Sequence, residues 1–265
     1  VKTLKGEELY EAVKHSVVEI STPSATGSGV FYESSGIIIT NRHVVDSFME
    51  VIVRLYSSAE YTGRVLRSFR DIDLAFLQIL DYETEIAIPA LCESNAEGET
   101  VYAIGSPNSL SNTITRGTIS SVGRLHNKLK YIQHDAAING GNSGGPLFNS
   151  RGELIGLNTW GYVNLEGLGF ALPMAYVSEK YTKSKEIIEN SADNRYCPIC
   201  GHSTAKPSKY CQACGVNLDA YNSLGELSEA FHNYKSECSC GQHRRETEKY
   251  CAQCGQTLLI QSKDS

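Results

Sequence analysis

Short runs of β-branched and other apolar residues, separated by glycine, proline, serine and charged residues, recur along the chain up to residue 172. Runs of this length with such boundaries are typical of β-strands, and many of them in succession indicate an all-β sandwich or barrel. We predict strands at residues 17–20, 27–32, 36–40, 51–56, 61–66, 74–79, 100–104, 114–122, 131–133, 146–148, 154–159 and 168–172.

Helical spacing of apolar residues occurs at both ends of this strand-rich part. It predicts a short N-terminal helix over residues 6–15 and a closing helix over residues 174–190, directly after Pro173. A further small helix is expected at residues 223–235, inside the C-terminal part of the chain.

Composition narrows the class of protein. The chain has 265 residues, of which 41% are hydrophobic, and no apolar run reaches the roughly 18 to 20 residues that cross a bilayer. No membrane span is therefore expected. A net charge of −6 argues against nucleic-acid binding, which usually requires a basic surface. The sequence starts at Val1 rather than methionine, so we expect any upstream targeting segment to lie outside it.

The nine cysteines divide the chain into two parts, because only Cys92 precedes residue 197. The other eight form two groups, spaced C-x2-C-x10-C-x2-C and C-x-C-x10-C-x2-C. Two close pairs of thiolates suit tetrahedral Zn²⁺, and bound metal would supply much of the folding energy. The groups look like tandem zinc ribbons with two structural Zn²⁺ ions, held by Cys197, Cys200, Cys211 and Cys214, and by Cys238, Cys240, Cys251 and Cys254.

Two alternatives to this metal assignment stay open. Disulfides could join the same cysteines, and His243 could replace a thiolate in the second group, which opens with the shorter C-x-C spacing. Thiolate zinc sites favour a reducing compartment, so the cytoplasm is slightly favoured over other locations. Cys92 has no nearby partner in the sequence and is expected to be an inert thiol.

One glycine-rich run, residues 139–146, has the sequence N-G-G-N-S-G-G-P. A serine among glycines indicates either a flexible loop or a nucleophilic hydroxyl beside exposed main-chain N–H groups. A serine nucleophile needs a base and a group that orients the base. His43 follows one apolar strand and Asp73 precedes another, so with Ser143 they have the His, Asp, Ser order of chymotrypsin-like triads.

The same residues carry a family resemblance. The motifs G-S-G-V-F, I-I-I-T-N-R-H-V-V, D-L-A-F-L-Q-I, A-I-G-S-P, T-R-G-T-I-S-S-V-G-R, D-A-A-I-N-G-G-N-S-G-G-P-L, G-E-L-I-G-L-N-T and G-L-G-F-A-L-P occur in this order from residue 27 to residue 173. They resemble the protease domain of the HtrA/Deg serine proteases. The resemblance implies a mainly β, trypsin-like fold of two six-stranded barrels over residues 1–190. We expect ribbons at residues 191–217 and 237–265, with a linker at 218–236.

The resemblance also implies roles for individual residues. His43 would be the general base and acid, Asp73 its orienting carboxylate and Ser143 the nucleophile. The main-chain N–H groups of Gly141 and Ser143 would bind the oxyanion. Thr159 matches the hydroxyl residue that often supports the aspartate, although an ordinary strand threonine is an equal alternative.

The region expected to bind substrate lies beside the strand over residues 157–161, which would pair with the substrate main chain. Ala137 stands where a trypsin-type pocket carries an acidic floor, so a small or aliphatic P1 residue is expected rather than Lys or Arg. The substrate-binding residues are predicted to be Ala137, Ile138, Thr159, Trp160, Gly161 and Gly169.

Three polar residues near these motifs have other expected roles. Asn142 stands where digestive trypsins place an aspartate, so Val1 has no salt bridge to complete. Asp71 is a rival for the triad carboxylate, but the D-L-A match favours Asp73. Asp135 is expected to have a structural hydrogen-bonding role.

Two functions are consistent with these patterns. The first is a serine endopeptidase that acts on protein or peptide substrates, with zinc ribbons that recognise a partner or substrate. The alternative is a latent or inactive protease fold whose ribbons mediate binding to proteins or, less readily, to nucleic acid. The tail has 8 Lys plus Arg against 8 Asp plus Glu, which favours protein partners. The sequence leaves the oligomeric state open.

Overall fold

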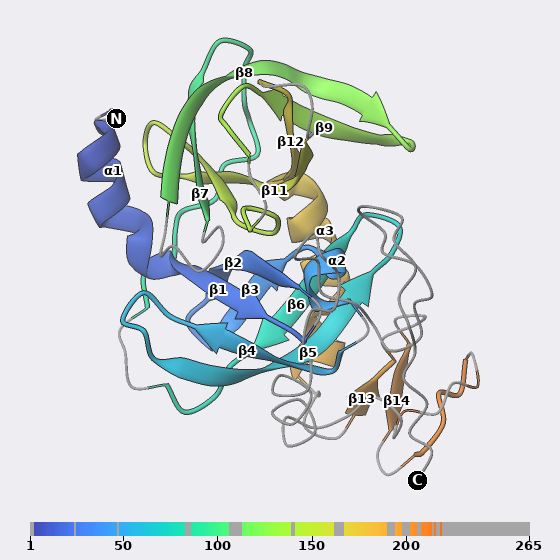
Figure 1. Ribbon diagram of the computed structural model, residues 1–265. Helices are drawn as coiled ribbons and strands as arrows, with labels where there is room; N and C mark the ends of the chain where they lie inside the picture. The colour runs from blue at the N-terminus through green and yellow to red at the C-terminus, as the bar shows by residue number, and fades with distance from the viewer. Residues whose placement is uncertain are drawn as a thin grey trace, which may run out of the picture.

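The computed structural model describes residues 3–23, 25–46, 48–82, 86–105, 113–138, 141–161, 167–189, 194–197, 202–205, 208–213, 215 and 218. Two closed β-barrels of six strands each make up most of this part of the chain (Figure 1). The strand order is β1-β2-β3-β6-β5-β4 in the first barrel and β10-β11-β12-β9-β8-β7 in the second. The mainly β double barrel expected from the sequence is confirmed.

The strands of the first barrel are antiparallel neighbours formed by the first half of the strand-rich region. They are β1 (Val17–Ser21), β2 (Thr26–Glu33), β3 (Ile37–Thr40), β4 (Glu50–Arg54), β5 (Glu60–Phe69) and β6 (Leu74–Gln78). The second barrel consists of β7 (Thr100–Gly105), β8 (Thr113–His126), β9 (Leu129–His134), β10 (Pro146–Asn149), β11 (Leu154–Gly161) and β12 (Gly169–Pro173).

The helices pack outside the barrels. The predicted N-terminal helix forms α1 (Gly6–Val13) followed by a 3₁₀ turn, η1 (Lys14–Ser16), and the predicted closing helix forms α3 (Met174–Glu189). The one-turn helix α2 (Arg42–Val45) was not predicted, because four residues are too few to show helical periodicity. None of the helices in the described residues is long and apolar enough to span a bilayer.

Three apolar clusters hold this arrangement. One fills the first barrel, with Phe31, Ile38 and Leu77 fully buried, and another fills the second barrel around Leu147 and Ile155. The third cluster joins residues of both barrels with apolar residues from α1 and α3, for example Leu9, Phe76, Leu157, Met174 and Tyr181. The two barrels and the helices therefore share one continuous apolar contact region.

The described part of the tail contains a short antiparallel hairpin of β13 (Asn194–Tyr196) and β14 (Ser203–Ala205), and β13 contacts β5 of the first barrel. The tandem ribbons were expected here. The second ribbon at residues 237–265, its possible ligand His243 and the predicted helix at residues 223–235 lie outside the described residues. The boundaries at 190, 217 and 236 stay predictions.

Candidate active site

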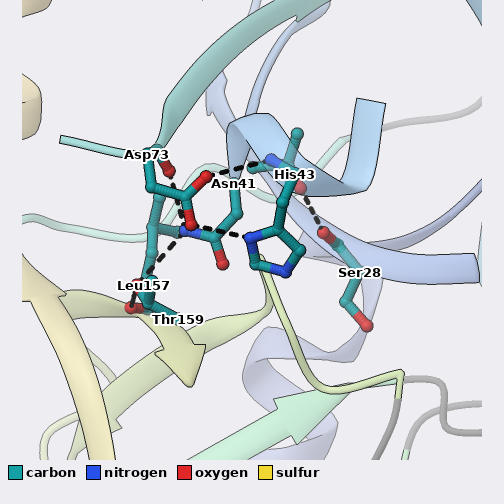
Figure 2. A network of polar contacts seen from close by, with 7 residues as sticks. Ser28, Asn41, His43, Asp73, Leu157 and Thr159 are labelled. Carbon is teal, nitrogen blue, oxygen red and sulfur yellow. Dashed lines mark hydrogen bonds and ion pairs between the residues drawn. The ribbon is translucent and has the colours of Figure 1, made fainter. Parts of the chain in front are cut away.

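His43 and Asp73 meet at one end of the first barrel, where α2 lies beside the turn that leads into β6. The Nδ1 atom of His43 is 2.7 Å from Asp73 Oδ2, and the main-chain N–H of His43 donates to Asp73 Oδ1 at 2.9 Å (Figure 2). Because a carboxylate is only an acceptor, this contact places the imidazole proton on Nδ1. Nε2 is left as the basic nitrogen.

The Asp73 main chain adopts an unusual conformation, with a φ of 54°. Aspartate tolerates this left-handed region better than most residues, but it still costs free energy. The Asp73 carbonyl accepts hydrogen bonds from the N–H of Arg42 at 3.1 Å and from the Asn41 side chain at 2.9 Å. These contacts hold the carboxylate towards His43 and offset the strain.

Thr159 supports this arrangement by way of Asn41. Its hydroxyl donates to the Leu157 carbonyl at 3.0 Å and accepts from the Asn41 amide at 3.2 Å. The same amide nitrogen bonds the Asp73 carbonyl, as Figure 2 shows. The hydroxyl therefore reaches the aspartate main chain through Asn41. Of the two expected roles, support of the aspartate and an ordinary strand threonine, this contact favours the first.

The loop that carries Ser143 is shaped by glycines. Gly141 has a φ of 101° and Gly144 a φ of 79°, both in the region where residues with a Cβ atom are strained. A Cβ atom on Gly144 would also collide with Thr40 Oγ1 and would lie 2.9 Å from the main-chain nitrogen of Asn41. Gly144 is therefore required both for its conformation and for close contact with the first barrel.

Ser28 on β2 joins this loop to the first barrel. Its N–H donates to the Ser143 carbonyl at 2.9 Å, and its hydroxyl donates to the Gly141 carbonyl at 2.6 Å. Both carbonyls are thus turned towards the first barrel. Among the described residues, neither the N–H of Gly141 nor that of Ser143 donates a main-chain hydrogen bond.

Ser143 is half-buried and lies close to the segment that carries His43. A Cβ atom on Gly27 would be 3.0 Å from the Ser143 carbonyl oxygen and 2.7 Å from the side chain of Val44, the residue after His43. The hydroxyl of Ser143 and the imidazole of His43 form no hydrogen bond with each other in the described part of the chain. Such bonds are often long before substrate binds.

Asn158 on β11 fixes the other side of the loop. Its N–H and carbonyl pair with Gly145 and Gly144 at 2.8 and 2.7 Å, and its side-chain nitrogen donates to the carbonyls of Gly145 and Pro146 at 3.2 and 2.9 Å. Four hydrogen bonds from one buried residue make the position of the Ser143 loop dependent on β11.

The residues predicted to bind substrate lie around this end of the second barrel. Ala137 is exposed, and Ile138 is close to Gly161, since a Cβ atom on Gly161 would be 3.6 Å from that of Ile138. Trp160 stacks on Phe170 with ring centroids 3.9 Å apart. Gly169 is buried against the ring of a histidine, His134.

The edge of β11 is open where substrate pairing was expected. Strand β10 pairs with β11 only as far as Leu157, while β12 covers the other side up to Gly161. Within the described residues, no strand occupies the β10 side of residues 159–161. An extended peptide could therefore add to this edge.

Charge near the candidate triad affects Tyr131, which is buried beside Trp160. Burial, followed by the negative charge of Asp73, raises the pKa of the Tyr131 phenol above its ordinary value. The phenol therefore stays neutral and adds no second negative charge near Asp73.

Other polar residues singled out in the sequence are occupied elsewhere. The carboxylate of Asp71 pairs with Lys180 of α3 at 2.7 Å, and Asp135 Oδ1 accepts from the N–H of Thr118 at 2.5 Å. Asn142 is buried, with both side-chain amide atoms lacking a partner in the described residues. The Cys92 thiol donates to the Ser94 carbonyl at 3.1 Å and lies 3.8 Å from a nitrogen of Arg151.

Sequence reasoning missed Ser28, Asn41, Asn158 and His134. Ser28 contacts Gly141 across 113 residues, and Asn158 contacts Gly145 and Pro146 across 13 and 12 residues, which no local pattern reveals. Asn41 could have been suspected, because asparagine directly before a helix is a common N-cap. Its side chain bonds Asp73 instead of capping α2.

Two of the eight predicted metal ligands fall within the described residues. Cys197 and Cys211 are both buried and pack together with Leu218. The N–H of Cys197 donates to the His202 carbonyl, and the N–H of Gly215 to the Cys211 carbonyl, both at 2.9 Å. The other six predicted ligands lie outside the described residues: Cys200, Cys214, Cys238, Cys240, Cys251 and Cys254. Within the described residues, no three metal-binding side chains lie together.

A family model described as a trypsin-like peptidase domain matches residues 27–157. The serine protease Do-like HtrA of Bacillus subtilis (strain 168) is 40% identical over 168 aligned residues, which cover 57% of this chain and 37% of that protein. A serine endoprotease structure from Yersinia pestis is 33% identical, with a TM-score of 0.62, covering 74% of this chain and 70% of that one.

A further solved structure, an AlgW variant described as an HtrA-type protease with a tripeptide, is 30% identical with a TM-score of 0.63. It covers 73% of this chain, and this chain covers 66% of it. The fold and these similarities define a serine protease with a trypsin-like peptidase domain. Within that class, the chain belongs to the HtrA-type serine endopeptidases. It spans well under half the length of the Bacillus relative.

Proposed function

We propose that the chain is a serine endopeptidase that hydrolyses peptide bonds of protein substrates with Ser143 as nucleophile, His43 as base and Asp73 as orienting carboxylate. The observation that carries this proposal is the double contact between His43 and Asp73, at 2.7 and 2.9 Å, beside a Ser143 loop that Ser28 binds from the same barrel. Family membership supports the same assignment.

The proposed reaction begins when Ser143 Oγ attacks the peptide carbonyl and its proton passes to Nε2 of His43. The charged imidazole is stabilised by Asp73 Oδ2 at Nδ1. His43 then gives the proton to the leaving amine, and an ester joins Ser143 to the acyl group. Water attacks that ester with His43 again as base, which releases the acid and restores the hydroxyl.

The oxyanion of each tetrahedral intermediate would accept from the N–H groups of Gly141 and Ser143. Neither group donates a main-chain hydrogen bond to a described residue, which supports this role, because an oxyanion hole needs N–H donors that are not already paired within the protein. Loss of one such donor in related enzymes costs about 2.7 to 4 kcal/mol of transition-state stabilisation.

The substrate is expected to bind as an added strand along residues 159–161 of β11, whose edge is open in the described structure. Trp160 and Gly161 would contact the residues before the cleaved bond. Ala137, Ile138 and Gly169 would bound a P1 pocket without a carboxylate, since Asp135 is engaged with Thr118. A small or aliphatic P1 residue is therefore proposed.

The tail is proposed to form zinc ribbons that bind a protein partner or position a substrate. The donor chemistry fits, because Cys197 and Cys211 are buried together and two thiolates are half of a four-thiolate site. A site of four thiolates leaves no open coordination position, so zinc would stabilise the fold rather than take part in catalysis. Thiolate ligands favour a reducing compartment such as the cytoplasm.

Cleavage of casein by the wild-type chain and by Ser143→Ala tests the protease assignment. Wild type is expected to degrade casein and to react with a fluorophosphonate probe, and Ser143→Ala is expected to do neither. Asp71→Asn is the matched control, because that carboxylate faces α3, and it should leave both activities unchanged. Equal casein cleavage by wild type and Ser143→Ala would overturn the proposal.

Ser143 and His43 form no hydrogen bond with each other in the described structure. The second candidate function is therefore a latent protease fold whose tail mediates binding. A latent fold would leave the probe unreacted in the wild type as well, while the tail still bound its partner. Probe labelling without substrate therefore separates an active resting site from a latent one.

A further inference from the structure

His134 is the last residue of β9 and is completely buried at one end of the second barrel. Its ring lies against the main chain of Gly169 on the neighbouring strand β12. A Cβ atom at Gly169 would be 2.5, 2.9 and 3.0 Å from the ring atoms Cε1, Nε2 and Nδ1. The imidazole therefore occupies space that only a glycine leaves free.

Both ring nitrogens of His134 lack a partner at hydrogen-bond distance in the described residues. The Oδ1 atom of Asn158, on the strand at the other side of β12, also lacks one. Asn158 pairs with Ala171 and His134 with Gly169, two residues apart on β12, so the two side chains lie on the same face of the sheet. Buried polar groups without partners are costly, so this pair requires an explanation.

Asn158 has no freedom to turn its side chain. Its Nδ2 atom donates to the carbonyls of Gly145 and Pro146, so Oδ1 must be the atom directed away from the Ser143 loop. That oxygen needs a donor. The imidazole N–H of His134 is the donor on the same face, and since no direct bond joins the two groups, one ordered water between them would complete the contact.

The surroundings keep His134 neutral. Burial lowers its pKa to about 4, because a charged ring would lose its hydration, and the opposing effects of Asn158, Asp135 and the Ala136 main chain are smaller. Asp135 is exposed and its carboxylate bonds Thr118. The strand neighbours of His134 are Ile119 on β8 and Gly169 on β12, neither of which carries a charge.

We propose that His134 is a positioning residue for the catalytic serine: its neutral imidazole holds the Asn158 amide, and Asn158 holds the main chain of residues 144–146, directly after Ser143. This extends the proposed function, on which it rests in taking Ser143 as the nucleophile. His134, at one end of the second barrel, is thereby linked to the Ser143 loop through the side chain of Asn158.

The test uses the full chain with three variants. His134→Leu keeps the volume but removes the donor, and His134→Gln keeps a donor. Val101→Ala changes a buried residue of β7, a strand that pairs with β8 and β10 rather than with β11 or β12. The folded fraction of each is measured by circular dichroism. The rate of fluorophosphonate labelling, and kcat and KM for a peptide, are then measured on folded protein.

His134→Leu is expected to lower labelling and kcat by about tenfold to a hundredfold with little change in KM, as displacement of a reacting group does. His134→Gln should recover most of this loss, and Val101→Ala should react like the wild type. Labelling of folded His134→Leu at the wild-type rate would overturn the proposal, since a purely structural residue would affect only stability.

A second measurement covers the case in which His134→Leu does not fold. The ¹⁵N spectrum of the wild-type imidazoles should show His134 neutral at pH 7 with one fixed tautomer, and Asn158→Ala should release that tautomer. Averaging between tautomers in the wild type would exclude the link to Asn158. A wild type that fails to label at all contradicts the protease function instead, and the spectrum still decides the role of His134.

Discussion

Three residues of the candidate active site have left-handed main-chain conformations. Asp73 has a φ of 54°, Gly144 of 79° and Gly141 of 101°. Asp73 is held by hydrogen bonds to both its carbonyl and its carboxylate, whereas the two glycines avoid the steric cost by having no Cβ atom. At this scale, the geometry of the site depends on local strain that neighbouring contacts offset.

Gly144→Ala tests how much of that cost comes from the close contact with the first barrel. Gly98 is a matched control, because its φ is 86° and a Cβ atom there would have no neighbour within 4 Å. Gly98→Ala should cost only main-chain strain, about 1–2 kcal/mol of the free energy of unfolding. Gly144→Ala should cost a further ~1–3 kcal/mol from overpacking. Guanidinium denaturation of both variants measures this, and equal losses would contradict it.

The buried imidazole of His134 should make stability depend on pH. Its pKa is about 4 in the folded chain against 6.5 ordinarily, so the unfolded chain binds more protons between these values. Stability should therefore fall as the pH drops from about 6.5 to about 4 and level off below, by roughly 3 kcal/mol in total. Urea denaturation at several pH values should show this slope reduced in His134→Gln. The same slope in both proteins would rule out His134 as its source.

The identities of His43, Asp73 and Ser143 could be proposed from the sequence because each lies in a motif with a local signature. The residues that hold these three in position could not be proposed from the sequence. Ser28 contacts Gly141 from 113 residues away, and His134 looks like an ordinary strand residue in the sequence. Long-range contacts of this kind depend on strand register, which one sequence does not specify.

At the scale of elements, the twelve strands of the barrels match the apolar runs in the sequence, because β-branched residues at short spacing are strong strand signals. The β8–β9 hairpin is the main surprise. It continues to His126 and projects beyond the rest of the barrel (Figure 1). Its two-residue turn, Asn127 and Lys128, has φ values of 47° and 69°. The turn has no glycine, so the usual hairpin signal was absent.

Lys128→Gly is expected to stabilise this hairpin. Glycine removes the cost of a left-handed lysine, which is about 1 kcal/mol, and asparagine followed by glycine suits a two-residue turn. A small rise in the melting temperature should result. Lys130→Gly is the control in the adjoining strand β9, where glycine should lower the melting temperature. A melting temperature that falls in both variants would show that the turn gains nothing from glycine.

At the scale of the whole molecule, the candidate site belongs to neither barrel alone. His43 and Asp73 come from the first barrel and Ser143 from the second, and the shared apolar cluster with α1 and α3 holds the barrels together. The double barrel could be expected from the family resemblance. The position of the tail hairpin β13–β14 beside β5 could not, because nothing in either segment marks it as a contact.

Zinc analysis tests the tail independently of catalysis. Under reducing conditions the chain should contain about two Zn²⁺ ions, as expected for two four-thiolate groups. Cys197→Ser or Cys211→Ser should lose about one ion, whereas Cys92→Ser, outside the tail, should keep both. A chelator should make the segment after residue 190 sensitive to trypsin while the barrels keep their thermal transition. Finding no zinc in reduced wild type would exclude the ribbons.

The two hydrogen bonds from Ser28 to the Ser143 loop have a consequence for synthesis. On a ribosome, the first barrel is complete many residues before β10–β12 emerge. A nascent chain that already carries His43 and Asp73 still lacks Ser143, and the two bonds from Ser28 can form only after residues 141–143 have been made. With Ser143 as the proposed nucleophile, proteolytic activity can therefore begin only after the second barrel has been made.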